Sequence, residues 1–315
     1  GLSDNTIRCI AQDTTGFLWF GSLNGLNRFD GIRIKTLIPE LNSRNSLSSG
    51  KIKDLYKDSY GHIWIRTYSD VFHCYNPFTE KFIFDNKDNN LTRHNLFYQD
   101  SEKNVWLGSV NSGCIKVTFD EEKISSKTFS TTKNELPSNN VKDIFEDSEK
   151  NIWILTNKGL RIIKNNAVLK LPELPSDSRN YLKAYEYKQN TVIVSVNGEI
   201  VQFDKKSFKQ KLSANLGKDI VVLKTTPLSP EKILISTDNK GVYLYNIKTN
   251  TIVRDIDFLG EFIPKQANLR TDALGNVWMN NFSGNVWMIN SKNPKVVKLN
   301  LIPASVLLLI DEERF

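Results

Sequence analysis

The sequence predicts an all-β fold, a seven-bladed β-propeller with four antiparallel strands in each blade. Three observations predict it: a recurring phrase, short runs of alternating polarity, and no helical pattern between them. The phrase D-x-x-(G/K)-x-(L/I/V)-W occurs five times, and in each copy the aspartate precedes the tryptophan by six residues. The five pairs are Asp13 and Trp19, Asp58 and Trp64, Asp100 and Trp106, Asp147 and Trp153, and Asp272 and Trp278.

The spacing of the tryptophans gives the number of blades. Successive tryptophans are 45, 42 and 47 residues apart, and a gap of 125 residues follows. The gap holds two more repeats of about 42 residues that lack the tryptophan. Residues 191–195 with Gly198, and 232–236 with Gly241, supply their strands and glycines. The seven predicted blades span approximately 1–46, 47–89, 90–134, 135–178, 179–216, 217–258 and 259–301.

Each repeat holds four short strands. In the fourth repeat the alternating runs are 141–146, 151–155, 160–163 and 167–171, which are rich in β-branched and aromatic residues. The aspartate is expected to accept backbone N–H groups in the turn before the second strand, where glycine supplies a positive φ. Lys103 and Lys150 replace that glycine, so either the lysine adopts the positive φ or the following Asn104 and Asn151 take that conformation.

The remaining parts of the repeat are predicted from the same pattern. The tryptophan lies on the second strand and is expected to pack between neighbouring sheets as a structural residue. The first strand is expected at 6–12 and the outer strand of blade seven at 295–301. Residues 302–315 resemble the start of another repeat and are interpreted as that start, a linker or a closing strand.

Composition excludes several classes of protein. The 315 residues are 39% hydrophobic and 24% charged, which argues against a disordered or fibrous chain. The longest apolar run, 304–310, is far shorter than the roughly 20 residues that span a bilayer, and no leader pattern opens the sequence. We therefore expect any signal peptide or anchor to lie outside this sequence. The net charge of +7 comes from lysines spread along the chain, which favours solvated surface over a nucleic-acid site.

The first repeat resembles the regulator propeller repeat of the hybrid two-component sensors of gut Bacteroidetes. The resemblance is carried by residues 2–7, 13–21 and 25–31. Repeats two, three, four and seven match more loosely, and repeats five and six match only in length and strand pattern. In that family the periplasmic sensor has two seven-bladed propellers and an immunoglobulin-like module, followed by a membrane helix, histidine kinase, receiver and DNA-binding domain.

The resemblance implies a role and partners for the chain. The chain would be the first propeller of the periplasmic part of an inner-membrane sensor, in contact with the second propeller and the immunoglobulin-like module, in a homodimeric full-length protein. The family senses oligosaccharides released from polysaccharides and switches on genes for glycan use. The chain carries no kinase, receiver or DNA-binding sequence, so the histidine kinase activity would belong to other parts of the full-length protein.

No catalytic set is visible in the sequence. The only histidines, His62, His73 and His94, lack metal-binding spacing. We expect His62 and His73 to be structural, and His94, in a polar loop between blades, to be a candidate ligand contact. Cys9, Cys74 and Cys114 form no C-x-x-C pair and are interpreted as buried hydrophobes. We find no nucleophile elbow, phosphate loop or calcium loop, so no catalytic residue, metal or cofactor is expected.

Binding residues are expected on one end of the blades. Loops that join second to third strands share that end with the connections between blades, and loops on a rigid scaffold often carry binding. The candidates there are Arg44, Arg66, Tyr68, Arg93, His94, Asn111, Lys158, Arg179, Asn180, Asn239, Lys265, Asn281 and Phe282. Amides, arginines and aromatics suit a polyhydroxylated ligand, and they equally suit a protein interface.

Three functions are therefore open. The first is a non-enzymatic periplasmic sensor module that recognises an oligosaccharide. The second is a propeller lyase of the streptogramin-inactivating type, which needs a histidine base and a magnesium-binding carboxylate. The third is a scaffold for another protein, where the positive charge would steer an acidic partner.

Overall fold

The computed structural model describes residues 1–40, 43, 45–86, 94–120, 123–169, 179–238, 240–254, 268–272, 274–280, 286–290 and 296–299. The chain divides into two compact units. Unit 1 comprises Gly1–Val141 and unit 2 begins at Lys142. No described helix is long and apolar enough to cross a membrane.

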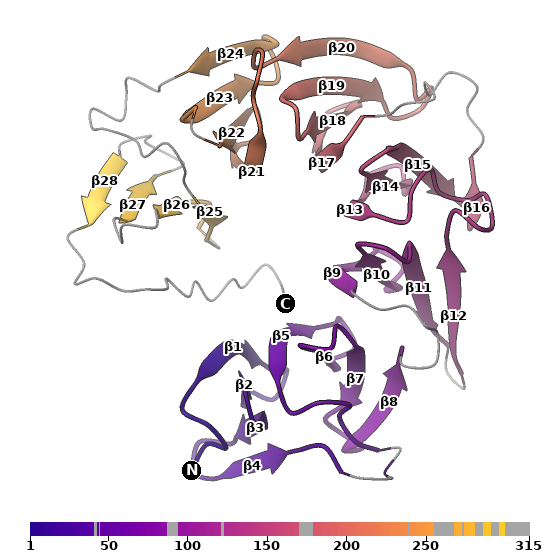
Figure 1. Ribbon diagram of the computed structural model, residues 1–315, viewed down its shortest axis with the longest axis vertical. Helices are drawn as coiled ribbons and strands as arrows, with labels where there is room; N and C mark the ends of the chain where they lie inside the picture. Colours follow the sequence, from indigo (N-terminus) through magenta and orange to yellow (C-terminus); the bar gives the residue numbers. More distant parts are fainter. Residues whose placement is uncertain are drawn as a thin grey trace. The chain divides into compact units, whose positions relative to one another are not determined.

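Seven four-stranded antiparallel sheets make up the regular structure of the described residues, and each is a meander in sequence order (Figure 1). Unit 1 holds β1 (Ile7–Gln12), β2 (Leu18–Ser22), β3 (Gly25–Phe29), β4 (Ile34–Leu37), β5 (Ile52–Lys57), β6 (Ile63–Thr67), β7 (Phe72–Asn76), β8 (Lys81–Asp85), β9 (His94–Gln99), β10 (Val105–Ser109), β11 (Cys114–Phe119) and β12 (Ile124–Phe129).

Unit 2 holds the other four sheets. Their strands are β13 (Val141–Glu146), β14 (Ile152–Thr156), β15 (Gly159–Lys164), β16 (Ala167–Val168), β17 (Tyr181–Tyr187), β18 (Asn190–Ser195), β19 (Glu199–Asp204), β20 (Gln210–Asn215), β21 (Val222–Ser229), β22 (Lys232–Thr237), β23 (Val242–Asn246), β24 (Thr251–Arg254), β25 (Asn268–Thr271), β26 (Val277–Asn280), β27 (Val286–Ile289) and β28 (Val296–Leu299). The first of these strands starts one residue before the unit boundary.

The predicted fold class is confirmed, because the number of sheets and their strand order are those of a seven-bladed β-propeller. The two repeats without tryptophan have their second strands, β18 and β22, at the predicted places. The fourth strand of the last sheet, β28, lies within the predicted range 295–301. Residues 302–315 lie outside the described residues.

Each meander has two ends that differ in what they carry. The turns between first and second strands and between third and fourth strands lie at one end, which we call the turn end. The loops between second and third strands lie at the other, the loop end, where the chain also enters the next sheet. The candidate binding residues were predicted for the loop end, and the recurring aspartates lie at the turn end.

The aspartate of each recurring phrase has two sets of hydrogen-bond partners. In the first repeat Asp13 Oδ1 accepts the backbone N–H groups of Thr15 and Phe17 at 2.9 and 3.0 Å, and Oδ2 accepts the indole N–H of Trp19 at 2.9 Å. The indole bond recurs in the other four copies at 2.7–2.8 Å. The spacing of six residues therefore has a second cause that the sequence did not reveal: it brings the tryptophan nitrogen to the carboxylate that caps the turn.

The lysines that replace glycine keep the positive φ themselves. Lys103 has φ 66° and Lys150 has φ 61°, close to the left-handed region that glycine adopts in the other copies. Asn104 and Asn151 instead donate their side-chain amides to the aspartate, at 2.9–3.0 Å. Asn276 donates to Asp272 in the same way although glycine precedes it, so the asparagine bond belongs to the turn whether or not a lysine is present.

The fifth and sixth sheets lack the motif because their turns are shorter. In the five copies five residues separate the first and second strands, whereas β17 and β18 pair Tyr187 with Asn190, and β21 and β22 pair Ser229 with Lys232. A two-residue turn has no N–H groups left for an aspartate to cap. In these two sheets the short turn has no capping aspartate, and the tryptophan that would bind to this aspartate is also missing.

Three of the recurring tryptophans, Trp19, Trp64 and Trp153, pack against the next sheet of their own unit, whereas Trp278 is half-buried. Trp19 is fully buried in a cluster with Ile52, Ile63 and Tyr75 of the next sheet, and Trp153 lies in a cluster with Ile193 and other residues of its neighbour. Each of these aromatic rings removes a large apolar surface from water.

The cysteines behave as buried hydrophobes. Cys74 and Cys114 are buried, and Cys9 is half-buried against the backbone of β2. Burial raises the pKa of the Cys9 thiol to about 12 and raises the pKa values of Cys74 and Cys114 as well, so all three are thiols at neutral pH.

Replacing Trp153 by Phe should cost more stability than the loss of ring area alone. The variant removes the indole hydrogen bond to Asp147 Oδ2, which keeps its bond from Asn151, and the loss of a hydrogen bond to a carboxylate should cost about 1.5–3 kcal/mol in addition. The matched control is Trp287→Phe, because Trp287 is buried on β27 and donates no hydrogen bond to a described aspartate. Denaturant unfolding followed by circular dichroism measures both, and equal losses would contradict the role of the bond.

Asp272 should contribute a pH-dependent part of stability. Desolvation by itself would raise the pKa of Asp272, but hydrogen bonds from Trp278, Asn276 and the turn backbone hold it below the ordinary value. A lowered folded pKa stabilises the fold above the unfolded value of about 3.9, and this contribution is lost as the pH falls through the folded pKa. The melting temperatures of the wild type and Asp272→Asn should therefore converge below about pH 4. A constant difference from pH 7 to pH 2 would contradict this.

Candidate functional site

A group of charged side chains surrounds an exposed tyrosine at the loop end of unit 1. Tyr68 follows β6 and its side chain is 40% exposed. Arg8 of β1 donates to the Tyr68 hydroxyl from Nε at 3.0 Å and from Nη2 at 2.7 Å. Lys53 of β5 places its ammonium 5.8 Å from the centre of the tyrosine ring. We call Arg8, Lys53, Asp54, Arg66, Tyr68 and Asp70 the Tyr68 cluster.

The second predicted residue in this cluster, Arg66, holds it together. Its side chain is only 8% exposed, and Nη1 donates to Asp54 at 2.9 Å while Nη2 lies 3.3 Å from Asp70. Lys53 lies 3.6 Å from Asp70 as well. Since its guanidinium is already bound on two sides, Arg66 positions the cluster, and the Tyr68 ring and Arg8 form its exposed part.

Unit 2 brings a second group of predicted residues together at its own loop end. The backbone N–H of Gly159, next to the exposed Lys158, donates to the carbonyl of Arg179 at 2.9 Å. Arg179 Nε lies 2.8 Å from Glu199 Oε2, and the Asn180 carbonyl accepts the N–H of Val196 at 2.7 Å. These residues lie at the connection between the fourth and fifth sheets, where Arg179 is paired with Glu199 and the buried Asn180 Oδ1 accepts no hydrogen bond from a described residue.

His94 lies in a different environment from the one its sequence suggested. It is the first residue of β9, not part of a polar loop, and it is fully buried. Its Nδ1 lies 2.9 Å from Asn86 Nδ2, so the side chain belongs to the interior at this point of the chain. Its polar neighbour Asn95, which helped to suggest a loop, is the second residue of the same strand and is exposed.

Asn111 lies in the loop between β10 and β11, as predicted, and is exposed. Its Oδ1 accepts hydrogen bonds from the hydroxyls of Ser109 and Ser112 at 3.1 and 3.0 Å, which shapes its own loop. The remaining candidates lie outside the described residues; they are Arg44, Arg93, Asn239, Lys265, Asn281 and Phe282.

The sequence reasoning missed four members of the Tyr68 cluster: Arg8, Lys53, Asp54 and Asp70. Three of them lie near the start of a first strand, at the loop end. The search considered only loops, although the beginning of each first strand reaches the same end of the sheet. Alternation could not have identified both Lys53 and Asp54, because they are consecutive and the register of β5 shifts between Ile52 and Asp54.

One cluster has the residue types of a metal site. Donor atoms of Asp58, His62 and Cys74 lie within 4.8 Å of one another. However, both oxygens of Asp58 already have partners. Oδ1 accepts two backbone N–H groups of the turn. Oδ2 accepts the indole N–H of Trp64 at 2.8 Å and lies 3.0 Å from His62 Nδ1. His62 thus takes the place that asparagine occupies in other copies of the turn. Because burial also keeps the Cys74 thiol protonated, the cluster is explained by the hydrogen bonds of the turn.

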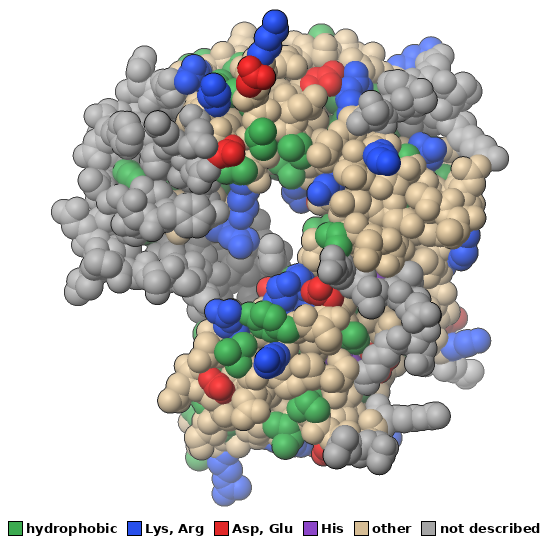
Figure 2. All heavy atoms as spheres, viewed as in Figure 1, with side chains coloured by type: hydrophobic (Ala, Val, Ile, Leu, Met, Phe, Trp, Pro, Cys, Tyr) green, Lys and Arg blue, Asp and Glu red, His purple; other side chains and the backbone are tan. Residues whose placement is uncertain are grey.

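Charge is distributed over the surface. On the face drawn in Figure 2, lysine and arginine side chains are scattered over the described parts of both units and mixed with acidic ones. On this face the distribution agrees with solvated surface charge, and the described lysines and arginines form no continuous basic track there.

The two arginines of the Tyr68 cluster should respond differently to substitution. Arg66→Met removes the cation between two partly exposed carboxylates and should lower the unfolding free energy by about 1–3 kcal/mol. Arg8→Ala removes an exposed side chain and should change the unfolding free energy by less than about 0.5 kcal/mol. Denaturant unfolding distinguishes the two, and equal effects would contradict the assignment of Arg66 as the positioning residue.

Three segments of the chain match the model of a known repeat family. The model of the two-component regulator propeller family matches residues 1–24, 46–69 and 135–158. Each matched segment contains a first strand, the aspartate turn and a second strand. No curated protein matches the chain significantly in sequence.

Several solved structures share the fold. The extracellular domain of the hybrid two-component system BT3049 of B. thetaiotaomicron matches with a TM-score of 0.54 and 20% identity, over 96% of this chain and 48% of that one. The extracellular domain of BT4673 of the same organism matches with a TM-score of 0.57 and 20% identity, over 91% of this chain and 40% of that one. Virginiamycin B lyase from Staphylococcus aureus matches with a TM-score of 0.52 and 13% identity, over 94% and 95%.

At these identities the similarity shows the fold alone. The chain spans less than half the length of the two B. thetaiotaomicron domains. The repeats carry more information than the fold, because the family model matches the aspartate turns themselves. The chain is therefore a seven-bladed β-propeller in which segments of three repeats match the two-component regulator propeller model.

Proposed function

We propose that the chain is an extracytoplasmic sensor domain of a hybrid two-component signalling protein and that it contributes to recognition of an oligosaccharide. The observation that carries the proposal is the match of three aspartate-turn segments to the two-component regulator propeller family. The fold shared with two extracellular domains of hybrid two-component systems supports it. The domain would lie in the periplasm, and its signal would regulate genes for polysaccharide use.

The Tyr68 cluster has the chemistry that an oligosaccharide requires. An exposed aromatic ring covers the apolar face of a sugar. Carboxylates beside it accept hydrogen bonds from the sugar hydroxyls, and guanidinium or ammonium groups donate hydrogen bonds to them. Arg8, Lys53 and Asp54 supply such groups around Tyr68, and the buried Arg66 holds the carboxylates in place. The oligosaccharide is therefore proposed to stack on Tyr68.

Signalling requires more of the protein than this chain. A ligand favours one arrangement of a receptor only by its difference in affinity between the arrangements. Because the chain spans less than half of the similar extracellular domains, we propose that a second propeller, an immunoglobulin-like module and a second copy of the full-length protein complete the sensor.

Lyase activity is the weaker proposal, although the fold is shared with virginiamycin B lyase. A lyase of that type needs an accessible histidine base. All three histidines of this chain are bound inside the fold: His62 to Asp58, His73 to Ser48 and His94 to Asn86. A scaffold for an acidic protein is also less favoured, because the positive charge is dispersed.

Titration of a panel of oligosaccharides into the chain by calorimetry tests the proposal. We expect binding by at least one member, and a loss of about tenfold or more in affinity for Tyr68→Ala. The matched control is Tyr60→Ala, because Tyr60 is 38% exposed but lies at the turn end of the same sheet.

Two results would contradict the proposal. One is the absence of heat with every member of the panel, and the other is an equal loss of affinity for Tyr60→Ala and Tyr68→Ala. Sodium chloride distinguishes a neutral sugar from an acidic protein, because association with the protein would weaken as salt rises and association with the sugar would not.

A further inference from the structure

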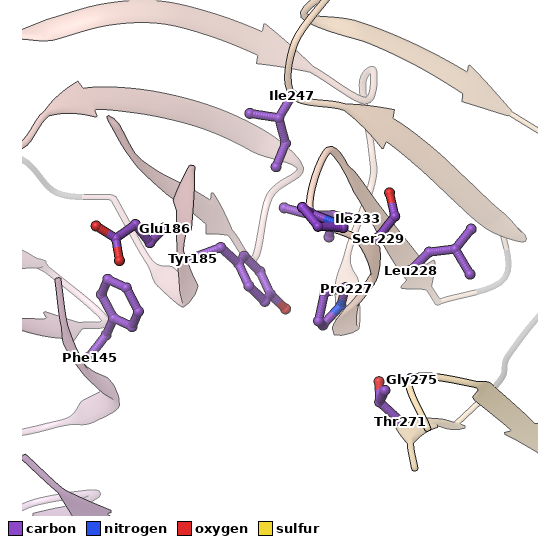
Figure 3. Close-up of a pocket in the computed structure, with 11 residues that line it drawn as sticks. Phe145, Tyr185, Glu186, Pro227, Leu228, Ser229, Ile233, Ile247, Thr271 and Gly275 are labelled. Atoms are coloured by element: carbon purple, nitrogen blue, oxygen red, sulfur yellow. The ribbon is translucent and has the colours of Figure 1, made fainter. Parts of the chain in front are cut away.

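Unit 2 contains a pocket of about 470 Å³ at its turn end, opposite the loops that carry Lys158 and Arg179. All four first strands of the unit contribute from their last residues: Phe145 of β13, Tyr185 and Glu186 of β17, Pro227 to Ser229 of β21, and Thr271 of β25. Figure 3 shows Glu186 and Phe145 on one side of the hollow, and Thr271 and Gly275 on the other. The volume is in the range of small-molecule sites.

The walls of the pocket are mostly apolar. Phe145, Tyr185, Pro227, Ile233 and Ile247 present rings and branched chains to the hollow. The hydroxyl groups among them already have partners. Tyr185 donates to Thr225 at 2.6 Å, and the Thr271 hydroxyl lies 2.5 Å from that of Thr226. The pocket therefore favours a compact apolar ring over a ligand with many polar groups.

Glu186 is the charged group of the lining. Its Oε1 accepts the backbone N–H of Ser148 at 3.0 Å and pairs with Lys205, whose side chain is only 3% exposed and also donates to the Ser148 hydroxyl at 2.8 Å. The backbone N–H of Ser148 and the ammonium of Lys205 both donate to this same oxygen, Oε1, and not to Oε2. The pair with Lys205 fixes the carboxylate and balances its charge, which leaves one oxygen for a ligand.

Charge balance and hydrogen-bond capacity together restrict the ligand. An ammonium ion would add a charge to a carboxylate that Lys205 already neutralises, so a neutral donor is favoured. A sugar brings several hydroxyls, and each one buried without a partner costs affinity. A single hydroxyl matches the single acceptor.

We propose that unit 2 binds a neutral apolar ring compound with one hydroxyl group in this pocket, and that the hydroxyl donates to Glu186 Oε2. This ligand differs in class and in place from the oligosaccharide at the Tyr68 cluster. The chain thus has two recognition sites, one at the loop end of unit 1 and one at the turn end of unit 2.

Calorimetry of the 315-residue chain with 2-naphthol tests the proposal. We expect the wild type to bind 2-naphthol. In Ser229→Phe the new ring should fill the pocket and lower the affinity for 2-naphthol at least about tenfold. The matched control is Ser126→Phe, because Ser126 is exposed on β12 and should bind 2-naphthol as the wild type does.

The methyl ether 2-methoxynaphthalene tests the hydrogen bond separately. Wild type should prefer 2-naphthol by about tenfold or more, because a hydrogen bond to a carboxylate is lost with the ether. Glu186→Gln should reduce this preference, and the exposed Glu149→Gln should keep it. The glutamine oxygen can still accept from Lys205, and the preference is a ratio within one variant, so a moderate loss of stability does not change it.

Three results would overturn the proposal. They are no binding of 2-naphthol by the wild type up to about 1 mM, binding that Ser229→Phe leaves unchanged, and binding of glucose that Ser229→Phe blocks. The last result would make the pocket a sugar site. None of them bears on the Tyr68 cluster, whose residues are untouched by these variants.

Discussion

The fold depends on one hydrogen-bonded carboxylate that is repeated five times. One oxygen of the aspartate accepts backbone N–H groups of the turn, and the other accepts the indole of a tryptophan on the second strand. The turn fixes where the second strand begins, and the tryptophan packs on the next sheet. A single side chain thus connects the local geometry of a hairpin to the packing between sheets, which explains why the family model matches these segments.

As a consequence, the two ends of the sheets differ in the groups that they carry. The turn end of most sheets is occupied by the aspartate turns, whose polar groups are bound to one another. The loop end has no such requirement, so it can carry exposed groups such as Tyr68 and Arg8. Sheets five and six have short turns without the aspartate, and there the pocket beside Tyr185 and Pro227 is found at the turn end. The pocket also takes in Phe145 of the fourth sheet and Thr271 and Gly275 of the last sheet, both of which keep the aspartate turn.

Much of the fold could be predicted from the sequence, because the signals are local. The period of the tryptophans and the alternation of polarity gave the seven sheets, including β18 and β22 where the tryptophan is missing. The bond between indole and aspartate could not be predicted, because spacing alone does not tell which way a side chain points. The positive φ of Lys103 and Lys150 was one of two open alternatives, which the sequence could not separate because lysine and asparagine can both adopt this conformation.

The candidate site was predictable only in part. Arg66 and Tyr68 lie at the expected end, but Arg66 is buried between two carboxylates and His94 is an interior residue of β9. Partners such as Arg8 are 60 residues away along the chain, and only the packing of β1 beside β5 brings them together. The ion pair of Lys205 with Glu186 has the same origin, since nothing in the sequence marks a buried lysine.

Hydrogen exchange of the tryptophan indoles tests most directly whether the aspartate bond supports the fold. Two-dimensional NMR of the nitrogen-15 labelled chain resolves the indole N–H groups of its six tryptophans. The account predicts that the five indoles bound to aspartate exchange with deuterium as slowly as the backbone amides of the second strands that carry them, with and without bound oligosaccharide. Exchange of these five within minutes, while the strand amides stay protected, would contradict it.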